Sequence, residues 1–168
     1  MMRGMTYLTL SGMISFQLRD YINQLRAVEG SYIGGLGRKP VVDTRLFGED
    51  GGPFRCEAEW NEFLLEVLVG TCPQVLKTMI RSQLRQDHKI ILTHGDLHPS
   101  NILIRDGRIV ALIDWERAGS YPEYLELISV LRGASWRAGY YHALFDIFPC
   151  RYDAEYIVDQ FIGRLSGR

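Results

Sequence analysis

Two aspartates and an asparagine stand at spacings that suit the transfer of a phosphoryl group. Asp96 lies five residues before Asn101, and Asp114 follows thirteen residues after Asn101. Phosphoryl transfer requires one carboxylate that orients the attacking hydroxyl, together with an amide and a second carboxylate that hold Mg²⁺ against the nucleotide phosphates. The three residues are therefore candidates for the acidic half of a phosphoryl-transfer site.

The residues around them follow a catalytic-loop pattern. The kinase signature reads H-R-D-L-x-x-x-N and is followed later by a metal-binding D-F-G. Residues 94–101 read HGDLHPSN, with Gly95 in place of the arginine, and residues 113–116 read IDWE. The step from the aspartate to the asparagine is preserved, which makes the local match specific.

The segment between Asn101 and Asp114 has the pattern of a β-hairpin. Residues 101–105 and 108–113 are largely apolar and rich in β-branched side chains. Asp106-Gly107 between them favours a two-residue type I′ turn. This turn predicts three facing pairs: Arg105 with Arg108, Leu103 with Val110, and Asn101 with Leu112.

The predicted hairpin brings two oxygen ligands together. Asp114 lies just past its open end, beside Asn101, and diagonal neighbours across antiparallel strands are roughly 7–8 Å apart. Mg²⁺ prefers carboxylate, amide and water oxygens and keeps several waters while it bridges phosphates, so two protein ligands suffice. Asp96 on the preceding loop would face the same opening and could accept the proton of a substrate hydroxyl.

Residues 93–123, THGDLHPSNILIRDGRIVALIDWERAGSYPE, resemble the aminoglycoside phosphotransferase and choline kinase-like family, and most of all its fungal small-molecule-kinase branch. The resemblance implies a protein-kinase-like fold and ATP- and Mg²⁺-dependent phosphoryl transfer to a hydroxyl of a small molecule. It implies Asp96 as the catalytic base and Asn101 and Asp114 as the magnesium ligands. The motifs cover about a fifth of the chain, and the resemblance rests on them.

Three neighbouring side chains are supporting candidates. We interpret His94 as an orienting residue rather than a proton carrier. His98 either approaches a phosphate or bonds to the backbone of its own loop. Glu116 either supports the metal ligands or is simply solvated.

A metal-dependent phosphoesterase is an alternative that uses the same residues. His94, Asp96 and His98 alternate and would share one face of a strand, as metal ligands can. Such a site needs further ligands, and the only later histidine is His142, which we expect to be a partly buried structural residue. An incomplete ligand set cannot fix a metal's geometry, which disfavours this alternative.

The rest of the chain predicts an α+β domain, mainly helical, over residues 1–168. Apolar residues recur at helical spacing on both sides of the motifs, whereas the stretch after the first helix is rich in glycine and proline. The predicted segments are a helix over 12–28 with Ser11 as its N-cap, a Gly/Pro-rich linker without regular structure over 30–55, helices over 57–86, a strand, catalytic loop and hairpin over 89–116, and helices over 122–165 with Pro122 in a first turn.

This order resembles only the carboxyl-terminal lobe of a two-lobed kinase. The amino-terminal lobe of such an enzyme supplies a lysine that pairs the nucleotide phosphates, and none of the three lysines, Lys39, Lys77 and Lys89, has the expected strand context. The cluster Gly34-Gly35-Leu36-Gly37 matches a phosphate-binding loop poorly. We therefore expect a missing amino-terminal lobe, and the chain is either an incomplete kinase or a noncatalytic remnant that acts as an interaction module. An uncovered lobe face would favour self-association.

Composition favours a soluble folded domain. The net charge is −1 with 23% charged residues, which gives no pull toward nucleic acid or membranes. No run has the length of a transmembrane helix, and a signal peptide is not expected. The three cysteines lack C-x-x-C spacing, so we expect reduced thiols and a cytoplasmic protein.

The sequence does not identify the substrate. By the resemblance, acidic side chains on the later helices would bind a cationic substrate. Glu116, Glu123, Glu126 and Asp146 are the candidates, but isolated charges usually lie at the surface. We therefore favour solvated helix charges for all four.

Overall fold

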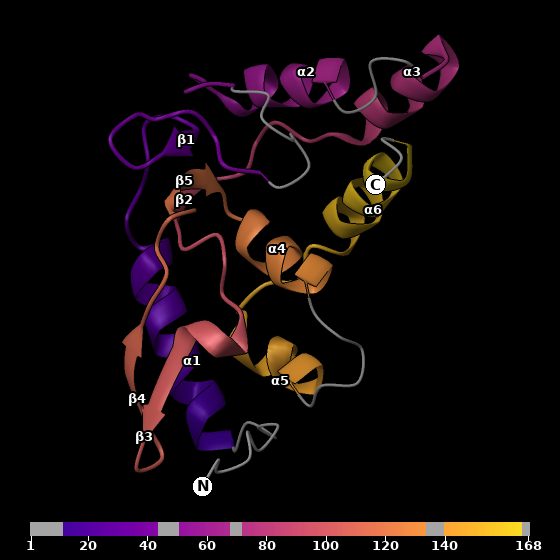
Figure 1. Cartoon of the computed structure of the whole chain (residues 1–168). Coiled ribbons are helices and arrows are strands. Elements are labelled where there is room, and N and C mark those ends of the chain that lie inside the picture. Colours follow the sequence, from indigo (N-terminus) through magenta and orange to yellow (C-terminus); the bar gives the residue numbers. More distant parts are fainter. Residues whose placement is uncertain (1–11, 44–50, 68–71, 134–139, 166–168) are drawn as a thin grey trace, which may run out of the picture.

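The computed structural model describes residues 12–43, 51–67, 72–133 and 140–165. These residues form a mainly helical α+β fold with a three-stranded and a two-stranded sheet (Figure 1). The elements are α1 (Gly12–Arg26), β1 (Gly34–Gly35), α2 (Glu57–Val67), α3 (Gln74–Gln83), β2 (Ile90–Thr93), the 3₁₀ turn η1 (Pro99–Asn101), β3 (Ile102–Arg105), β4 (Arg108–Leu112), β5 (Gly119–Pro122), α4 (Leu125–Gly133), α5 (Tyr140–Ile147) and α6 (Asp153–Leu165). In Figure 1, α2 and α3 lie at one end and α1 with the β3–β4 hairpin at the other, with the three-stranded sheet and α4 between them.

The six described helices lie where the sequence pattern predicted helices. α1 falls within residues 12–28, α2 and α3 within 57–86, and α4 to α6 within 122–165. The proposed N-cap Ser11 and the linker residues 44–50 lie outside the described residues.

The glycine-rich linker contains a strand that the sequence did not predict. Gly34 and Gly35 form β1, which pairs antiparallel with the central strand β5 in the order β1-β5-β2. The pairing depends on a close backbone approach, because a Cβ at Gly119 would lie only 2.3 Å from the Gly34 carbonyl oxygen. The expectation of no regular structure over 30–55 was therefore wrong at this point, since the glycines allow strand pairing rather than only breaking structure.

Pro122 belongs to a strand rather than to the first turn of a helix. It ends β5 opposite Ile90, and α4 begins at Leu125. Proline has no N–H to donate, and the Glu123 N–H continues the ladder instead, 2.9 Å from the Lys89 carbonyl oxygen. The prediction of a helix start at Pro122 was therefore wrong.

The β3–β4 hairpin carries a bulge that shifts its register by one residue. Asp106 and Gly107 both have positive φ, 50° and 71°, as the type I′ turn requires. Arg105 pairs with Arg108 as predicted. The register then shifts at Val110, so the observed pairs are Leu103 with Ala111 and Ile102 with Leu112. The predicted pairs Leu103 with Val110 and Asn101 with Leu112 were wrong for this reason.

Helix α1 holds the hairpin in place. Its apolar stripe, Ile14, Leu18 and Ile22, is at most 3% exposed and recurs at helical spacing. On the neighbouring face, the Gln17 side-chain oxygen accepts a hydrogen bond from the Ile109 N–H at 3.0 Å, and its amide nitrogen donates to the Gly107 carbonyl at 3.2 Å. The Gln17 side chain therefore pairs with two backbone groups, one in the hairpin turn and one in β4.

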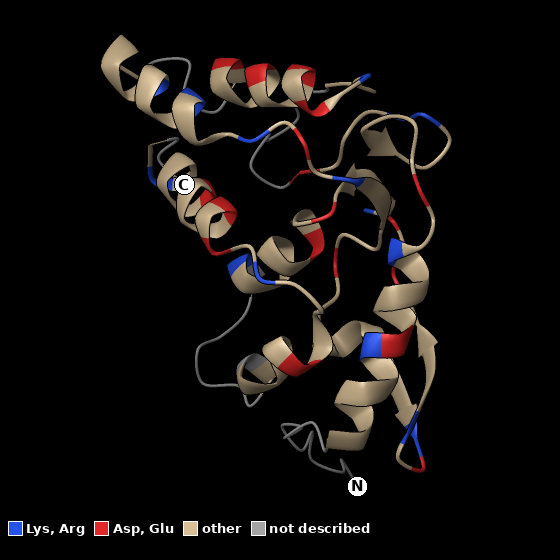
Figure 2. Cartoon of the chain, turned by 180° about the vertical axis from the view of Figure 1, so that it is seen from behind, with Lys and Arg blue, Asp and Glu red and all other residues tan. Residues whose placement is uncertain are grey.

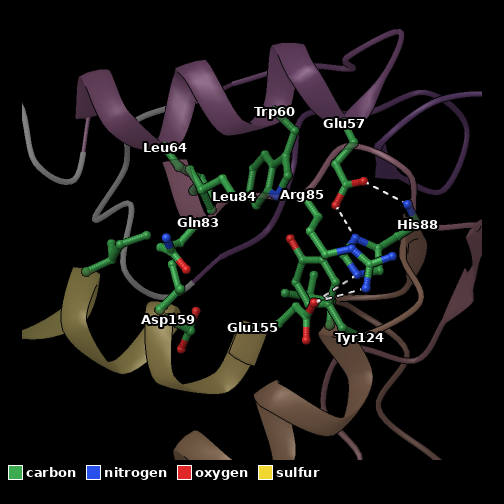
Figure 3. Close-up of a pocket in the computed structure, with 13 residues that line it drawn as sticks. Glu57, Trp60, Leu64, Gln83, Leu84, Arg85, His88, Tyr124, Glu155 and Asp159 are labelled. Carbon is green, nitrogen blue, oxygen red and sulfur yellow. Dashed lines mark hydrogen bonds and ion pairs between the residues drawn. The ribbon is translucent and has the colours of Figure 1, made fainter. Parts of the chain in front are cut away.

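A buried histidine side chain connects helix α2 to helix α6. The His88 side chain is 3% exposed, and its Nδ1 lies 2.8 Å from Glu57 at the start of α2. Its Nε2 lies 3.2 Å from Glu155 in α6 (Figure 3). The Tyr124 ring packs against the His88 ring, with the two ring centroids 4.7 Å apart. The Arg85 guanidinium lies 3.7 Å from the Glu155 carboxylate. These groups line a small cavity of about 30 Å³, and Figure 3 shows the residues around it.

The two carboxylates favour a charged His88. Burial lowers the pKa of His88, but the hydrogen bond to Glu57 and the negative charges of Glu57 and Glu155 outweigh it, so the pKa is raised above its ordinary value. Both ring nitrogens can donate only in the imidazolium form.

Charged residues of both signs are distributed over the fold. Figure 2 shows acidic residues along α2 and basic residues on α3, which are joined by the ion pair between Glu62 and Arg81 at 2.6 Å. The three cysteines, all described, are unpaired. Among the described residues, no helix combines the length and the apolar character needed to cross a bilayer.

We predict that His88 makes stability depend on pH. A raised native pKa contributes stability that is fully present below the unfolded value of about 6.5 and is lost as the pH rises through the native pKa. Substitution His88→Gln should therefore cost about 1.5–3 kcal/mol of unfolding free energy at pH 6, the usual contribution of charge-assisted hydrogen bonds. The cost should shrink by pH 9. Urea unfolding across this range measures both, and a cost that is independent of pH would contradict the charged form.

Candidate active site

The loop after β2 is fixed by hydrogen bonds between its own residues. β2 ends at Thr93, which pairs with Gly119 of the central strand. The His98 N–H donates to the Asp96 carbonyl at 2.8 Å, and the Asn101 N–H donates to the His98 carbonyl at 2.8 Å. These two bonds bring Asp96 and Asn101, which are five residues apart, to the same side of the loop.

The Asn101 side chain contacts Asp96 directly. Its amide nitrogen donates to the Asp96 carbonyl at 2.9 Å and to the Asp96 carboxylate at 3.3 Å. Asn101 is 8% exposed, so this orientation is fixed within the fold. From the described part of the chain, its amide oxygen accepts only the Ser100 hydroxyl, at 3.4 Å, and it retains a lone pair for a further partner.

The bulge brings Asp114 one residue closer to Asn101 than a regular hairpin would. The Ile113 N–H donates to the Asn101 carbonyl at 2.9 Å, and Asp114 follows Ile113 directly. Asp114 is exposed and has a φ of 65°. Left-handed backbone at a non-glycine residue is uncommon and clusters at functional sites. The structure thus brings together the three residues that the motif spacing singled out.

His94 is an internal support of the loop. It is fully buried, its Nε2 lies 3.0 Å from the Ile113 carbonyl, and its Nδ1 lies 3.3 Å from the Asp96 N–H. Burial lowers the pKa of His94 despite the Ile113 carbonyl and the nearby charges of Asp96 and Asp114. A neutral ring with its proton on Nε2 satisfies both contacts. His94 therefore links the segment of Asp114 to that of Asp96, and its ring packs 4.5 Å from the Trp115 ring.

A buried carboxylate anchors the start of the loop. Glu126 in α4 is 6% exposed, and its oxygens accept the His94 N–H at 2.5 Å and the Gly95 N–H at 3.1 Å. Burial raises the pKa of Glu126 to about 7, although the two N–H donors and their hydrogen bonds oppose the shift, and the Asp96 charge adds to it. The expectation that Glu126 is a solvated charge was wrong. An acid within the apolar run YLELISVL is the sequence signal that could have found it.

Gly95 occupies a position that no other residue fits. Its φ is +81°, and a Cβ would lie 2.5 Å from the Arg117 carbonyl oxygen. The kinase signature has an arginine here, whereas the glycine of this chain allows the loop to lie close to the segment after Asp114. In this chain, residues 95 and 117 are in backbone contact.

A cavity of about 250 Å³ opens beside Asp96. Its walls include Val42, Tyr121, Leu125 and Arg117, the last of which lies 3.4 Å from the Asp96 carboxylate. No lysine lines this cavity: Lys39 and Lys89 are exposed, and Lys77 is on α3. Arg117 was not predicted from the sequence, because an arginine two residues after a D-W pair is not part of the kinase signature.

The other candidate residues have structural or solvent-exposed positions. His98 is exposed, and its Nδ1 bonds the Ser100 hydroxyl at 2.9 Å and the Ser100 N–H at 3.3 Å, which is the backbone-bonded alternative. Glu116 is exposed and lies 3.8 Å from Arg117. His142 is exposed, so the expectation of partial burial was wrong.

Glu123 is likewise not a free surface charge. Its carboxylate pairs with Arg26 at 2.6 Å and accepts the Tyr152 hydroxyl at 2.9 Å. Asp146 is exposed, as expected for a solvated helix charge. Two of the four acids considered for a cationic substrate, Glu123 and Glu126, thus make hydrogen bonds or ion pairs within the fold.

One comparison with known proteins covers the residues of this site. The profile of the family described as "Phosphotransferase enzyme family" matches residues 48–156, which include the loop, the hairpin and Glu126. The chain belongs to the phosphotransferase enzyme family.

A solved structure supports a protein-kinase-like fold. The crystal structure of macrolide 2′-phosphotransferase MphH from Brachybacterium faecium, an apoenzyme, matches with a TM-score of 0.50 and 21% sequence identity. The match covers 95% of this chain and 53% of that protein, so the chain spans about half the length of this phosphotransferase. No curated protein matches the chain.

We predict that Gly95→Ala destabilises the protein and disrupts the loop. The added Cβ meets the Arg117 carbonyl, and the residue would keep a left-handed backbone, so a loss of about 1–3 kcal/mol is expected. The matched control is Gly163→Ala in α6, where a Cβ meets nothing within 4 Å and helix propensity favours alanine. Thermal unfolding compares the two, and equal stabilities would rule out the steric account.

We predict that Glu126 also makes stability depend on pH. Its native pKa of about 7 exceeds the unfolded value of about 4.3, so its contribution is fully present below pH 4.3 and is lost as the pH rises through 7. The loss is on the order of 3 kcal/mol. Substitution Glu126→Gln should flatten this part of the stability profile, whereas the exposed Glu116→Gln should not. If the Glu126 variant keeps the stability profile of the wild type, Glu126 does not have the raised pKa.

Proposed function

We propose that this chain carries the acidic half of an ATP- and Mg²⁺-dependent phosphotransferase that acts on a hydroxyl of a small molecule. The observation that carries the proposal is the set of hydrogen bonds around Asn101. Its side chain holds Asp96, and its carbonyl pairs with the residue before Asp114. These bonds support an arrangement in which Asp96, Asn101 and Asp114 lie at one end of the hairpin.

The donor set suits Mg²⁺. The Asn101 amide nitrogen is committed to Asp96, which leaves the amide oxygen for a cation, and Asp114 supplies a carboxylate. Hard oxygen ligands of this kind are those that Mg²⁺ takes in nucleotide sites, with waters and phosphate oxygens completing the set. When bound, the ion would neutralise the charge of the nucleotide phosphates. Asn101 and Asp114 would hold it.

Asp96 is proposed as the base that orients the acceptor. Its carboxylate is part-buried, borders the 250 Å³ cavity and is steadied by Asn101. A carboxylate in this position can accept the proton of an acceptor hydroxyl that enters the cavity. His94 would support this role through its contact with the Asp96 N–H rather than by carrying a proton.

The domain assignment remains part of the proposal. We propose that residues 1–168 correspond to the carboxyl-terminal lobe of a two-lobed enzyme. The lysine that pairs the nucleotide phosphates would belong to the other lobe, because none of the three lysines of this sequence, Lys39, Lys77 and Lys89, lines the cavity beside Asp96. The fungal small-molecule-kinase branch is likewise proposed on the THGDLHPSN motif. Exposed apolar side chains beside the metal ligands, Leu103 and Ile113, give such a lobe a surface to cover. Self-association through that surface is the alternative.

A noncatalytic binding module is the second candidate function. It would retain the same fold and the same acid cluster, which the hydrogen bonds above would maintain for stability alone. The phosphoesterase alternative receives less support, because His94 is buried with both ring nitrogens occupied and His98 caps its own turn. Among the described residues, no group of three or more His, Cys, Asp and Glu side chains could hold a metal.

We predict that two variants separate the roles of the acids. Asp114→Asn should abolish Mg²⁺-dependent ATP binding, because it removes the anionic metal ligand. Asp96→Asn should retain that binding but reduce phosphoryl transfer at least a hundredfold, the lower end of general-base contributions. Calorimetric titration of Mg²⁺-ATP measures the first effect, and release of ADP with an acceptor measures the second.

The hairpin supplies a matched control. Asp106→Asn makes the same change in the type I′ turn, where asparagine is favoured, so both properties should stay as in the wild type. Binding of Mg²⁺-ATP that survives Asp114→Asn would refute the proposed metal site. The absence of binding in every form, the wild type included, would favour the noncatalytic module.

A further inference from the structure

The cavity beside Asp96 has the size of a small acceptor. Its volume is about 250 Å³, below the roughly 300–1,000 Å³ typical of sites for drug-sized ligands. A water molecule occupies about 30 Å³ in the liquid, so the space corresponds to about eight waters. Leu125 and Val42 give it an apolar wall, and Ser129 and the charged residues give it a polar one.

The charges around the cavity do not favour a cation. Arg132 lies on its wall and is held by Asp159 in two hydrogen bonds, at 2.8 and 2.5 Å, and by Asp43 at 3.6 Å. The hydrogen bond to Asp159 and both negative charges raise the pKa of Arg132 against the effect of burial, so it stays charged. The Asp43 carboxylate is therefore matched by a cation of the protein.

Arg117 brings hydrogen-bond donors to the same cavity. Its guanidinium is about one third exposed, and its closest partners are the Asp96 carboxylate at 3.4 Å and Glu116 at 3.8 Å. Both are ion-pair contacts, and with the described residues the Arg117 side chain makes no hydrogen bond. Its N–H donors can therefore turn to a ligand, and the fork of an arginine fits a carboxylate in two parallel bonds.

We propose that the acceptor is a small hydroxycarboxylate whose hydroxyl meets Asp96 and whose carboxylate meets Arg117. The inference rests on the proposed role of Asp96. An Asp96 oxygen and an Arg117 nitrogen are 3.4 Å apart, and hydrogen bonds to each are about 2.7–3.0 Å long. One small molecule with its hydroxyl and carboxylate two to four bonds apart can reach both. The acceptor proton would pass to Asp96, and the hydroxyl oxygen would form the new bond to phosphorus as the bond to the nucleotide breaks.

The test compares ligands that differ in charge, on the full chain. Calorimetric titration uses glycerate and gluconate, their uncharged counterparts glycerol and sorbitol, and the cations choline and kanamycin. The carboxylates are expected to bind at least tenfold more tightly than the other four compounds. Arg117→Gln should remove this preference, and Arg117→Lys should restore part of it by returning the charge without the fork. Arg105→Gln, at the exposed end of β3, is the matched control and should leave the preference intact.

Four results would overturn the inference. These are tighter binding of a cation or an uncharged polyol, carboxylate binding that Arg117→Gln leaves unchanged, and no binding by any compound. The fourth is an equal loss of kcat with gluconate and sorbitol in Arg117→Gln, which would assign the guanidinium to the transferred phosphoryl group rather than to the acceptor.

Phosphate transfer from ATP, measured separately, tests the proposed function. Carboxylate binding that depends on Arg117 without any transfer would favour the noncatalytic module over the phosphotransferase while supporting the oxyanion site. Transfer of phosphate to a cation alone would support the phosphotransferase proposal and reject the oxyanion site.

Discussion

The candidate site depends on one buried carboxylate. Glu126 accepts the N–H groups of His94 and Gly95, and so connects helix α4 to the first residues of the catalytic loop. The positions of the next residues follow from this anchor. Gly95 turns the chain with its positive φ, Asp96 follows it, and the Asn101 side chain closes the loop by a hydrogen bond to Asp96. A group that costs free energy to bury is tolerated because it satisfies two backbone donors that would otherwise be unpaired.

The same loop is also held by contacts to His94 and Leu97, in addition to those of Glu126. His94 bridges to the Ile113 carbonyl, and the Tyr140 hydroxyl of α5 donates to the Leu97 carbonyl at 2.9 Å. The loop thus has supports on three separate elements: α4, α5 and the segment that follows the hairpin. Family membership and the geometry agree on this region, which lies within the residues that match the phosphotransferase family.

Sequence patterns predicted what depends on local spacing and missed what depends on packing. The Asp-Gly turn and the helical stripes are local, so the hairpin tip and α1 could be read directly. The strand at Gly34-Gly35 and the position of Arg117 arise from contacts between distant segments, for which a single sequence carries no periodic signal. The error at Pro122 is of the same kind, since its partner strand β2 lies about thirty residues earlier.

The bulge at Val110 divides the hairpin into two arms with separate constraints. Between the turn and the bulge, residues pair as in a regular ribbon, whereas beyond it β4 runs one residue ahead of β3. Equal additions to both strands at the tip would lengthen the ribbon without altering how Asn101 meets Ile113. Deletion of Val110 alone would remove the bulge and leave Asn101 opposite Ile113, because Val110 is the extra residue between the pairs Ile104 with Ile109 and Leu103 with Ala111. The interval of thirteen residues between the two oxygen ligands is therefore not one free length: Val110 accounts for one residue as the bulge, and the pairing around the turn accounts for the other twelve.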